Sequence, residues 1–198
     1  MRIYLVRPDT KYHEQYNEMM REWTESNTDI APWFLNKPFN APFNDINEFE
    51  RYVNLLLKYE TESVDPQYTT QSDYFAVDED DRLVGAGRLA HNLYADTYDE
   101  NGSGFNIWGH IGYGVRLSDR KKGYGTQIAR LLLEKARDIN ILKVFAGVHD
   151  SNTGSIRVIE NCGGILEKIV SIPEDTEQIR IYSIDNKQQV NTMLNKVK

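Results

Sequence analysis

The sequence is poor in cysteine, because Cys162 is the single one in 198 residues. One thiol excludes an internal disulfide, leaves no cysteine cluster for zinc, and agrees with a reducing compartment. Long hydrophobic runs are also missing, since no apolar stretch approaches the ~20 residues that cross a bilayer. The first ten residues have neither the length nor the cleavage pattern of a signal peptide. We therefore expect a cytoplasmic protein with no membrane association and no bound metal.

The chain also lacks the excess of positive charge that nucleic-acid binding requires. Its formal net charge is −7, whereas binding to a phosphate backbone needs a cationic surface. We therefore expect no nucleic-acid partner. Against this acidic background, the basic run of Arg116, Arg120, Lys121 and Lys122 indicates a local anion site. A solvated basic turn is the alternative.

What is present is the composition of an ordinary globular protein, with 40% hydrophobic and 27% charged residues. At this length a single domain is the expectation. Periodicity predicts strands at residues 2–6, 73–77, 82–90, 110–117, 143–148, 165–172 and 179–184, and helices at 12–26, 45–60, 122–139 and 152–162. This order predicts an α/β fold, in which helices cover both faces of a mixed sheet.

The stretch RKKGYG, residues 120–125, lies between a predicted strand and a predicted helix. Its three cations stand at a helix end that is already partially positive, where a sequence chosen for stability would have acidic residues. Gly123 and Gly125 lack a Cβ atom, so backbone N–H groups there can approach a ligand closely. A strand, a glycine turn and a helix in this order make a cradle for phosphate groups.

Two common phosphate-binding patterns do not fit this turn. The Walker pattern requires Gly-Lys-Ser/Thr at the end of the loop, but Thr126 and Gln127 follow Gly125. The dinucleotide fingerprint requires a third glycine where this chain has Ile128. A nucleotide-binding protein would be supported only if ATP or NAD, and no other cofactor, stabilised the fold.

The pattern R-x-x-G-x-G, from Arg120 to Gly125, resembles the coenzyme A signature of the GNAT acetyltransferase superfamily. An apolar residue stands eight positions before its first glycine, and Leu117 occupies a position that is often proline. Downstream, NTGSIRVIENCGG resembles the branch with Asn-x-x-Ser-Ile-Arg-Val-Leu-Glu, in which Asn152, Ser155, Glu160 and Gly163 are in register. The resemblance extends over roughly residues 74–184.

This resemblance implies a mostly antiparallel central sheet of about seven strands, with a parallel pair splayed at the cofactor site. Within one domain over 1–198, residues 1–60 would shape the acceptor site and residues 74–184 would form the coenzyme A-binding core. The implied activity is transfer of an acetyl group from acetyl-CoA to a primary amine of a small molecule or peptide, by direct attack in a ternary complex. A non-catalytic acyl-CoA-binding sensor or regulatory module is the alternative.

The resemblance also implies which residues meet the cofactor. Pantetheine would lie between the strands at 110–117 and 143–148, as an added strand would. Backbone groups, with charge from two lysines, would hold the pyrophosphate. The cofactor-binding residues so implied are Val115, Leu117, Arg120, Lys121, Lys122, Gly123, Tyr124, Gly125, Thr126, Asn152 and Ser155. For Asn152, a helix N-cap alone is the alternative.

For catalysis, the Val115 N–H is the natural oxyanion donor. Many family members carry a glutamate base where this chain has Gly109, which makes the neighbouring His110 the first candidate for the base. A core histidine and a water chain are the alternatives. The tyrosine that often protonates the thiolate is replaced by Ile159. Tyr113 is a candidate acid or substrate contact, as are Tyr182 and His149 with less support.

The acceptor amine is expected beyond the thioester, beside the first two helices and the loop between them. Four aromatic residues of this loop could wall a substrate, with core packing as the alternative: Trp33, Phe34, Phe39 and Phe43. The sequence does not choose among a polyamine, an aminoglycoside, an amino acid and a peptide. A homodimer through exposed strand edges at the carboxyl end is an open alternative to a monomer.

Overall fold

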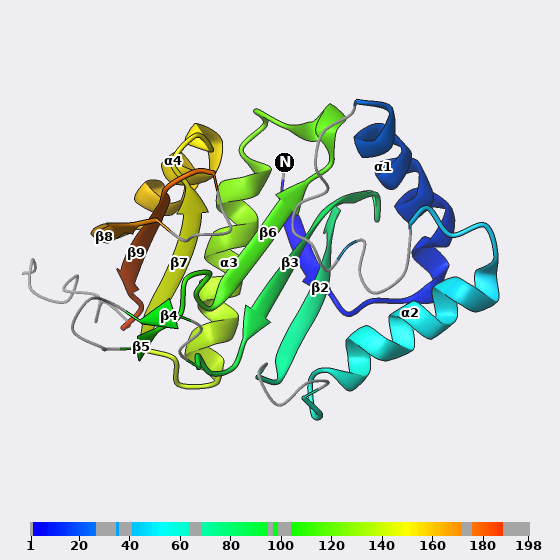
Figure 1. The fold of residues 1–198 in the computed structure, drawn as a ribbon. Coiled ribbons are helices and arrows are strands. Elements are labelled where there is room, and N and C mark those ends of the chain that lie inside the picture. The colour runs from blue at the N-terminus through cyan, green and yellow to red at the C-terminus, as the bar shows by residue number, and fades with distance from the viewer. Residues whose placement is uncertain are drawn as a thin grey trace, which may run out of the picture.

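The computed structural model describes residues 2–26, 35, 41–63, 69–94, 97–98, 104–171 and 176–187. Its longer strands are β1 (Ile3–Val6), β2 (Gln71–Asp78), β3 (Leu83–Ala90), β6 (Ile111–Val115), β7 (Lys143–His149), β8 (Ile165–Val170) and β9 (Ile179–Asp185). Its α-helices are α1 (His13–Glu25), α2 (Ile46–Lys58), α3 (Tyr124–Asp138) and α4 (Thr153–Asn161). Figure 1 shows their arrangement. The predicted order of seven strands and four helices is confirmed.

The strands form two larger sheets rather than the one that the sequence predicts. One has the order β1-β2-β3-β6 and the other β7-β9-β8, and every ladder is antiparallel. β6 and β7 run in the same direction (Figure 1), but they diverge before a parallel ladder can form between them. The two strands of the expected parallel pair therefore run in the same direction but are not hydrogen-bonded as a parallel ladder.

Helices cover both faces of the first sheet, because successive residues of its strands pack into different cores. Phe75 lies in a core with α1 and α2, whereas the next residue, Ala76, lies in a core with α3 and α4. This alternation is the period of two that a strand imposes on its side chains. The two helix pairs therefore lie on opposite faces, with β6 between them.

The core beneath α1 and α2 is aromatic. Tyr16, Phe43, Phe49 and Tyr52 pack with ring centroids 5.0–5.9 Å apart. The Asn17 amide donates to the Phe43 carbonyl at 2.7 Å and accepts from its N–H at 2.7 Å. Phe43 is thus a core residue, and the other loop aromatics, Trp33, Phe34 and Phe39, lie outside the described residues.

Two boundaries differ from the sequence-based expectation. β6 ends at Val115 instead of residue 117, because a 3-10 helix, η3 (Leu117–Asp119), turns the Leu117 side chain toward the α1–α2 core. Two short antiparallel strands of two residues each, β4 (Thr97–Tyr98) and β5 (Gly104–Phe105), pair within a stretch in which the sequence predicts only turns. In the described part of the chain, no helix is long and apolar enough to span a bilayer.

Candidate active site

β6 and β7 meet at one end, which we call the junction and define as residues 107–110 and 145–147. Here the Gly147 N–H donates to the Trp108 carbonyl at 3.0 Å, and the His110 N–H donates to the Phe145 carbonyl at 2.8 Å. Gly109 has a φ of 76°, which favours glycine. A Cβ atom on Gly147 would lie 1.9 Å from a backbone oxygen. Close approach of the two backbones therefore depends on glycine at both positions.

The His110 side chain belongs to this junction. His110 is 8% exposed, and its Nδ1 accepts a hydrogen bond from the Phe145 N–H at 3.0 Å. Because Nδ1 is an acceptor, the proton of the neutral ring lies on Nε2. Burial lowers the pKa of His110 to about 4. The imidazole is therefore neutral near pH 7, and its basic nitrogen is already engaged by the backbone.

Beyond the junction, one edge of β6 is not hydrogen-bonded to another strand of the described residues. The even-numbered positions direct their backbone groups to β3, as the Arg116 N–H does in donating to the Val84 carbonyl at 2.9 Å. Neighbouring residues of a strand point to opposite edges, so Ile111, Tyr113 and Val115 direct their N–H and C=O groups toward β7. Among the described residues, no ladder joins β6 to β7. We call this unpaired edge of β6, which faces β7, the opening.

The glycine turn stands at the open end of β6. Gly123 is the N-cap of α3 with a φ of 83°, and Lys121 also has a positive φ, 63°. The first-turn N–H groups of a helix have no acceptor within the helix, and such turns concentrate N–H groups on one point. A Cβ atom on Gly123 would meet no atom of the described residues within 4 Å. The space in front of the turn is therefore open.

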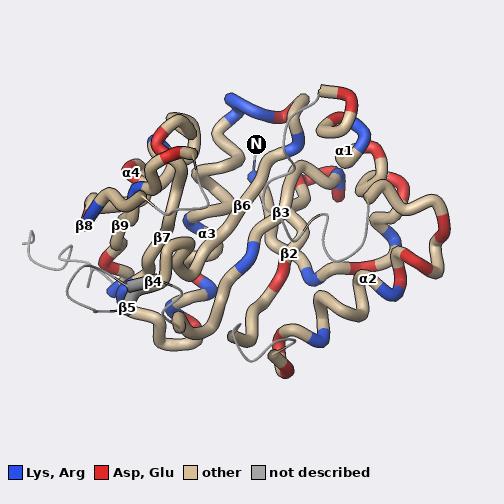
Figure 2. The backbone as a smooth tube through the Cα atoms, viewed as in Figure 1, with Lys and Arg blue, Asp and Glu red and all other residues tan. Residues whose placement is uncertain are grey.

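The cations of the turn are held in different ways. The Lys122 ammonium lies 2.8 Å from one oxygen of Asp119, and Arg82 lies 2.7 Å from the other. Asp119 is buried, so its charge is matched within the protein. Lys121 is exposed and has no ion pair with any described residue. Figure 2 shows the basic turn at the upper end of β6.

Arg120 points toward α1. Its guanidinium carbon lies 6.0 Å from the centroid of the Trp23 ring, at the outer limit of a cation–π contact. Burial lowers the pKa of Arg120, and its N–H donates to the Leu117 carbonyl at 3.2 Å. Arg120 and Lys121 are therefore the two cations of the turn that an external anion would meet without displacing an internal carboxylate.

The N-terminus of α4 lies across the opening from β6. Asn152 is the N-cap, and its Oδ1 accepts from the Ser155 N–H at 3.0 Å. The Tyr113 hydroxyl of β6 lies 2.8 Å from the Ser155 Oγ and donates to the Ser155 carbonyl at 3.3 Å. Burial raises the pKa of Tyr113, so the phenol keeps its proton at neutral pH. Tyr113 therefore connects β6 to α4.

The remaining predicted positions are near the turn or in the core. Gly125 lies in the first turn of α3, where a Cβ atom would be 3.3 Å from Val158 of α4, and Thr126 follows it. The Tyr124 side chain is buried in the α3 core, so only its backbone faces the turn. Leu117 directs its side chain to the α1–α2 core.

The three weaker candidates have structural contacts. Tyr182 is buried, and its hydroxyl donates to Glu160 at 3.2 Å. His149 packs edge-to-face on Trp108 with ring centroids 5.3 Å apart. Ile159 is buried in the α3 core, and so fills the position of the absent family tyrosine with packing alone.

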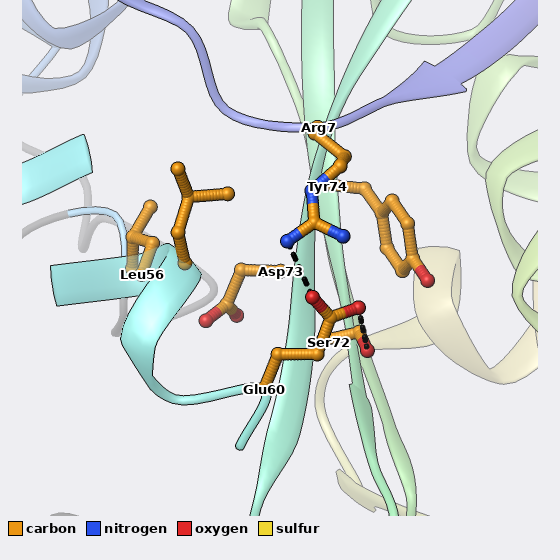
Figure 3. Close-up of a pocket in the computed structure, with 7 residues that line it drawn as sticks. Arg7, Leu56, Glu60, Ser72, Asp73 and Tyr74 are labelled. Atoms are coloured by element: carbon orange, nitrogen blue, oxygen red, sulfur yellow. Dashed lines mark hydrogen bonds and ion pairs between the residues drawn. The ribbon is translucent and has the colours of Figure 1, made fainter. Parts of the chain in front are cut away.

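A small pocket lies between the C-terminal end of α2 and β2, and Figure 3 shows it. It is lined by Arg7, Leu56, Leu57, Glu60, Ser72, Asp73 and Tyr74. Glu60 forms an ion pair with Arg7 and accepts from the Ser72 hydroxyl at 3.4 Å. Burial raises the pKa of Asp73 to about 7, and its Oδ1 has no hydrogen bond from the described residues. No predicted cofactor residue lines this pocket.

Sequence reasoning missed two carboxylates that hold the region of the turn, Glu22 of α1 and Asp119 of η3. Glu22 contacts Arg116 and Ser118, which follow it by more than ninety residues, so no local pattern indicates these contacts. Asp119 stands beside the basic run, and a spacing of three residues from Lys122 is the signal that could have revealed it.

Several solved acetyltransferase structures are similar to this fold. The microcin C7 self-immunity acetyltransferase MccE, bound to acetyl-CoA and AMP, has a TM-score of 0.61 at 16% identity, covering 92% of this chain and 91% of that one. The spermidine/spermine N-acetyltransferase SpeG from Vibrio cholerae gives 0.57 at 14%, covering 92% and 93%. The putative acetyltransferase yncA from Salmonella typhimurium, with acetyl-CoA, gives 0.58 at 12%, covering 96% and 97%.

These likenesses show the fold. A search of curated protein sequences found no match. The family comparison is more specific, because the model of the acetyltransferase (GNAT) domain matches residues 2–165, which include β6, the glycine turn, α3, β7 and α4. The chain therefore belongs to the GNAT acetyltransferase family, and it is an acetyl-CoA-dependent N-acetyltransferase.

Proposed function

We propose that the protein transfers the acetyl group of acetyl-CoA to a primary amine of a small molecule or peptide, by direct attack of the amine in a ternary complex. The observation that carries this proposal is the free edge of β6, which leads from the junction to the glycine turn. An extended ligand with an anionic end fits a strand edge that ends in a cradle of N–H groups.

The turn fits a pyrophosphate on its own geometry. The space that a Cβ atom on Gly123 would enter is empty, and the positive φ of Lys121 and Gly123 matches an anion-binding turn. Arg120 and Lys121 would add charge, whereas Lys122 would act mainly through Asp119. Backbone groups of residues 121–126 would hold the pyrophosphate, Val115 the pantetheine along β6, and Asn152 and Ser155 the same arm from α4.

Acetyl-CoA supplies an activated acetyl thioester when bound. The Val115 N–H points into the opening and would donate to the carbonyl oxygen as negative charge develops there. The new bond joins the amine nitrogen to the acetyl carbon, and the bond that breaks joins this carbon to sulfur. The amine must lose a proton, and the sulfur must be stabilised and then protonated.

His110 as the general base stays a prediction, and its geometry favours a different role. A ring whose Nδ1 accepts from the Phe145 N–H, with a pKa lowered to about 4, is a weak base at neutral pH. We propose that His110 fixes the junction, and that water carries the amine proton away from the site. The acceptor nitrogen would then be deprotonated by solvent before attack.

The Tyr113 hydroxyl is the group that we propose as the acid. The phenol lies 2.8 Å from the Ser155 Oγ on the first turn of α4, beside the path proposed for the pantetheine. Because burial keeps the phenol protonated, it would donate a hydrogen bond to the departing thiolate. The thiolate would take this proton while the phenol regains one from the water that receives the amine proton. Ser155 would hold the phenol in place. This pair would replace the tyrosine that Ile159 displaces.

Two further expectations concern the whole chain. We propose that residues 1–198 act as one domain, because β1 pairs with β2 and α1 contacts the segment after β6. A homodimer stays a prediction. It is supported by the exposed side chains of Ile165, Leu166 and Ile169 on β8, an edge strand of its sheet.

The first test is thermal unfolding with acetyl-CoA, coenzyme A, ATP and NAD, each at saturating concentration. Selective ligands raise the unfolding temperature by mass action, and we expect a rise with acetyl-CoA and coenzyme A only. An amine panel should follow, with release of free thiol as the readout. Spermidine and a peptide with a free amino terminus belong in it, because similar structures include a spermidine N-acetyltransferase and an α-N-protein acetyltransferase. Binding without turnover on any amine would contradict the proposed transfer.

A further inference from the structure

We infer that Glu22 of α1 is a positioning residue for the cofactor site, because it fixes the segment between β6 and the glycine turn from the acceptor side of the molecule. We call this segment, residues 116–119, the connector. The inference rests on the proposed binding of acetyl-CoA at the turn. Affinity for the cofactor would then depend on α1, a helix that would not touch the cofactor.

Both carboxylate oxygens of Glu22 are used. Oε1 lies 2.5 Å from the Arg116 Nε and accepts from the Ser118 hydroxyl at 3.1 Å. Oε2 accepts from the Ser118 backbone N–H at 2.9 Å. One side chain therefore accepts three hydrogen bonds from two residues of the connector. Charge-assisted bonds of this kind are among the stronger ones in proteins.

Burial of Arg116 makes its ion pair with Glu22 important. The Arg116 side chain is 10% exposed, so its charge requires a partner inside the protein. Glu18 is the second carboxylate nearby, at 3.4 Å from a terminal nitrogen of Arg116, but it is 57% exposed. Burial alone would raise the pKa of Glu22, but the bonds from Ser118 and Arg116 outweigh it and lower the pKa. Glu22 is therefore ionised at neutral pH.

The connector begins directly after Val115, whose N–H points into the opening, and ends directly before Arg120 of the turn. The residue after Glu22 is Trp23, over whose ring the Arg120 guanidinium lies. Glu22 and Trp23, which are neighbours in α1, therefore contact the connector and the first residue of the turn, respectively. On its other side, Asp119 ties the connector to Arg82 and Lys122. Two carboxylates, one local and one from α1, thus define where the turn stands relative to β6.

The consequence is a link between the acceptor side and the cofactor side. If α1 keeps its place, the connector presents the Val115 N–H and the turn in one fixed arrangement. If the contact with Glu22 is lost, Arg116 must turn toward Glu18 or solvent, and the connector gains freedom that cofactor binding must then remove. Loss of Glu22 should therefore weaken cofactor binding in a protein that is still folded.

The test compares Glu22→Gln with Glu25→Gln, a matched change on an exposed residue of α1 that has no ion pair with the described residues. Calorimetry with acetyl-CoA, at a temperature where all variants are folded, should give a Kd about tenfold higher for Glu22→Gln and unchanged for Glu25→Gln. The KM for acetyl-CoA should rise in proportion, while the KM for the acceptor should change less than twofold. If Glu22 had a purely structural role, Glu22→Gln would lower the unfolding temperature without raising the KM for acetyl-CoA more than the KM for the acceptor.

Ser118→Ala gives a second measure that does not depend on the stability of α1. It removes one of the three hydrogen bonds to Glu22 and leaves the backbone bond, so we expect a two- to threefold rise in Kd, about half the effect in logarithmic terms. If Glu22→Gln and Ser118→Ala both bind acetyl-CoA as the unmodified protein does, the inference is overturned. If the unmodified protein itself fails to bind acetyl-CoA, the proposed function fails instead.

Discussion

The two ends of the β6–β7 pair are held by different forces. At the junction, backbone hydrogen bonds, glycine contacts and one neutral histidine hold the strands together. At the open end, charged side chains hold the connector and the turn through Glu22 and Asp119. Contacts within the backbone therefore close one end, whereas the open end depends on charged side chains and carries the turn proposed to bind an anion.

The largest effect is expected from Gly123→Glu at the open end. The glutamate side chain would bring bulk and negative charge into the space proposed for the pyrophosphate, and its backbone would have to adopt an unfavourable positive φ. Binding of acetyl-CoA should therefore weaken by ~10³-fold or more. Gly163→Glu is the matched control, because Gly163 has a φ of 85° and a Cβ atom there would also meet nothing within 4 Å. Calorimetry should show loss of binding in the first variant only. Unchanged affinity in Gly123→Glu would remove the turn from the cofactor site.

At the closed end, His110→Asn should change the pH dependence of stability. The folded-state pKa of His110 is lowered to about 4 from 6.5. Between these values the unfolded chain binds a proton that the folded protein does not, so the histidine's contribution is present above pH 6.5 and lost as the pH falls toward 4. The loss amounts to at most about 3 kcal/mol. Urea unfolding of both proteins from pH 7.5 to 4.5 should show this difference. It should vanish in the asparagine variant, whose amide oxygen can still accept from Phe145.

The same variant tests the role of the ring in catalysis. If His110 only fixes the junction, the pH profile of turnover keeps its shape in His110→Asn. A loss of activity that is greatest below the pKa of the acceptor amine would instead identify His110 as the base.

Tyr113→Phe should act on chemistry rather than on binding. Loss of the phenol should lower kcat by ~10²-fold while the Kd for acetyl-CoA stays within threefold, since no charged contact is removed. Ser155→Ala should give a smaller loss in the same direction, because Ser155 only holds the phenol. A normal kcat in Tyr113→Phe would mean that solvent, and not Tyr113, protonates the departing thiolate.

The smallest effect is expected from Asp119→Asn. Lys122 would lose its internal partner and become available to the pyrophosphate, whereas the connector would lose its tie to Arg82. These changes oppose each other, so we expect the Kd to change less than about fivefold and its dependence on salt to steepen, because one more cation is exposed to solvent. Titration at low and high ionic strength measures this. A salt dependence equal to that of the unmodified protein would mean that Lys122 stays away from the anion.

Much of the fold could be predicted because its signals are local. The stripe from Ile128 to Ala136 predicts α3, and Gly163 with Gly164 predicts the end of α4. The end of β6 was predicted wrongly, since the apolar Leu117 extends the pattern of the strand although its side chain packs on the other core. Periodicity cannot tell which core receives a side chain.

The candidate site was predictable only where a motif is continuous. Residues 120–126 carry such a motif, and so do Asn152 and Ser155. The contact between Glu22 and Arg116 joins residues 94 apart in the chain, and it depends on the angle at which α1 crosses the sheet. The state of His110 depends on an irregularity at Gly109 that no spacing rule specifies. Tertiary geometry decides both.

The free edge of β6 has a consequence for solubility. The backbone groups that would bind pantetheine present the same template to an extended segment of any other chain, and unpaired strand edges promote intermolecular association. An amount of cofactor sufficient to occupy the edge would therefore act as a chemical chaperone, and the protein should aggregate more slowly during expression and storage in its presence.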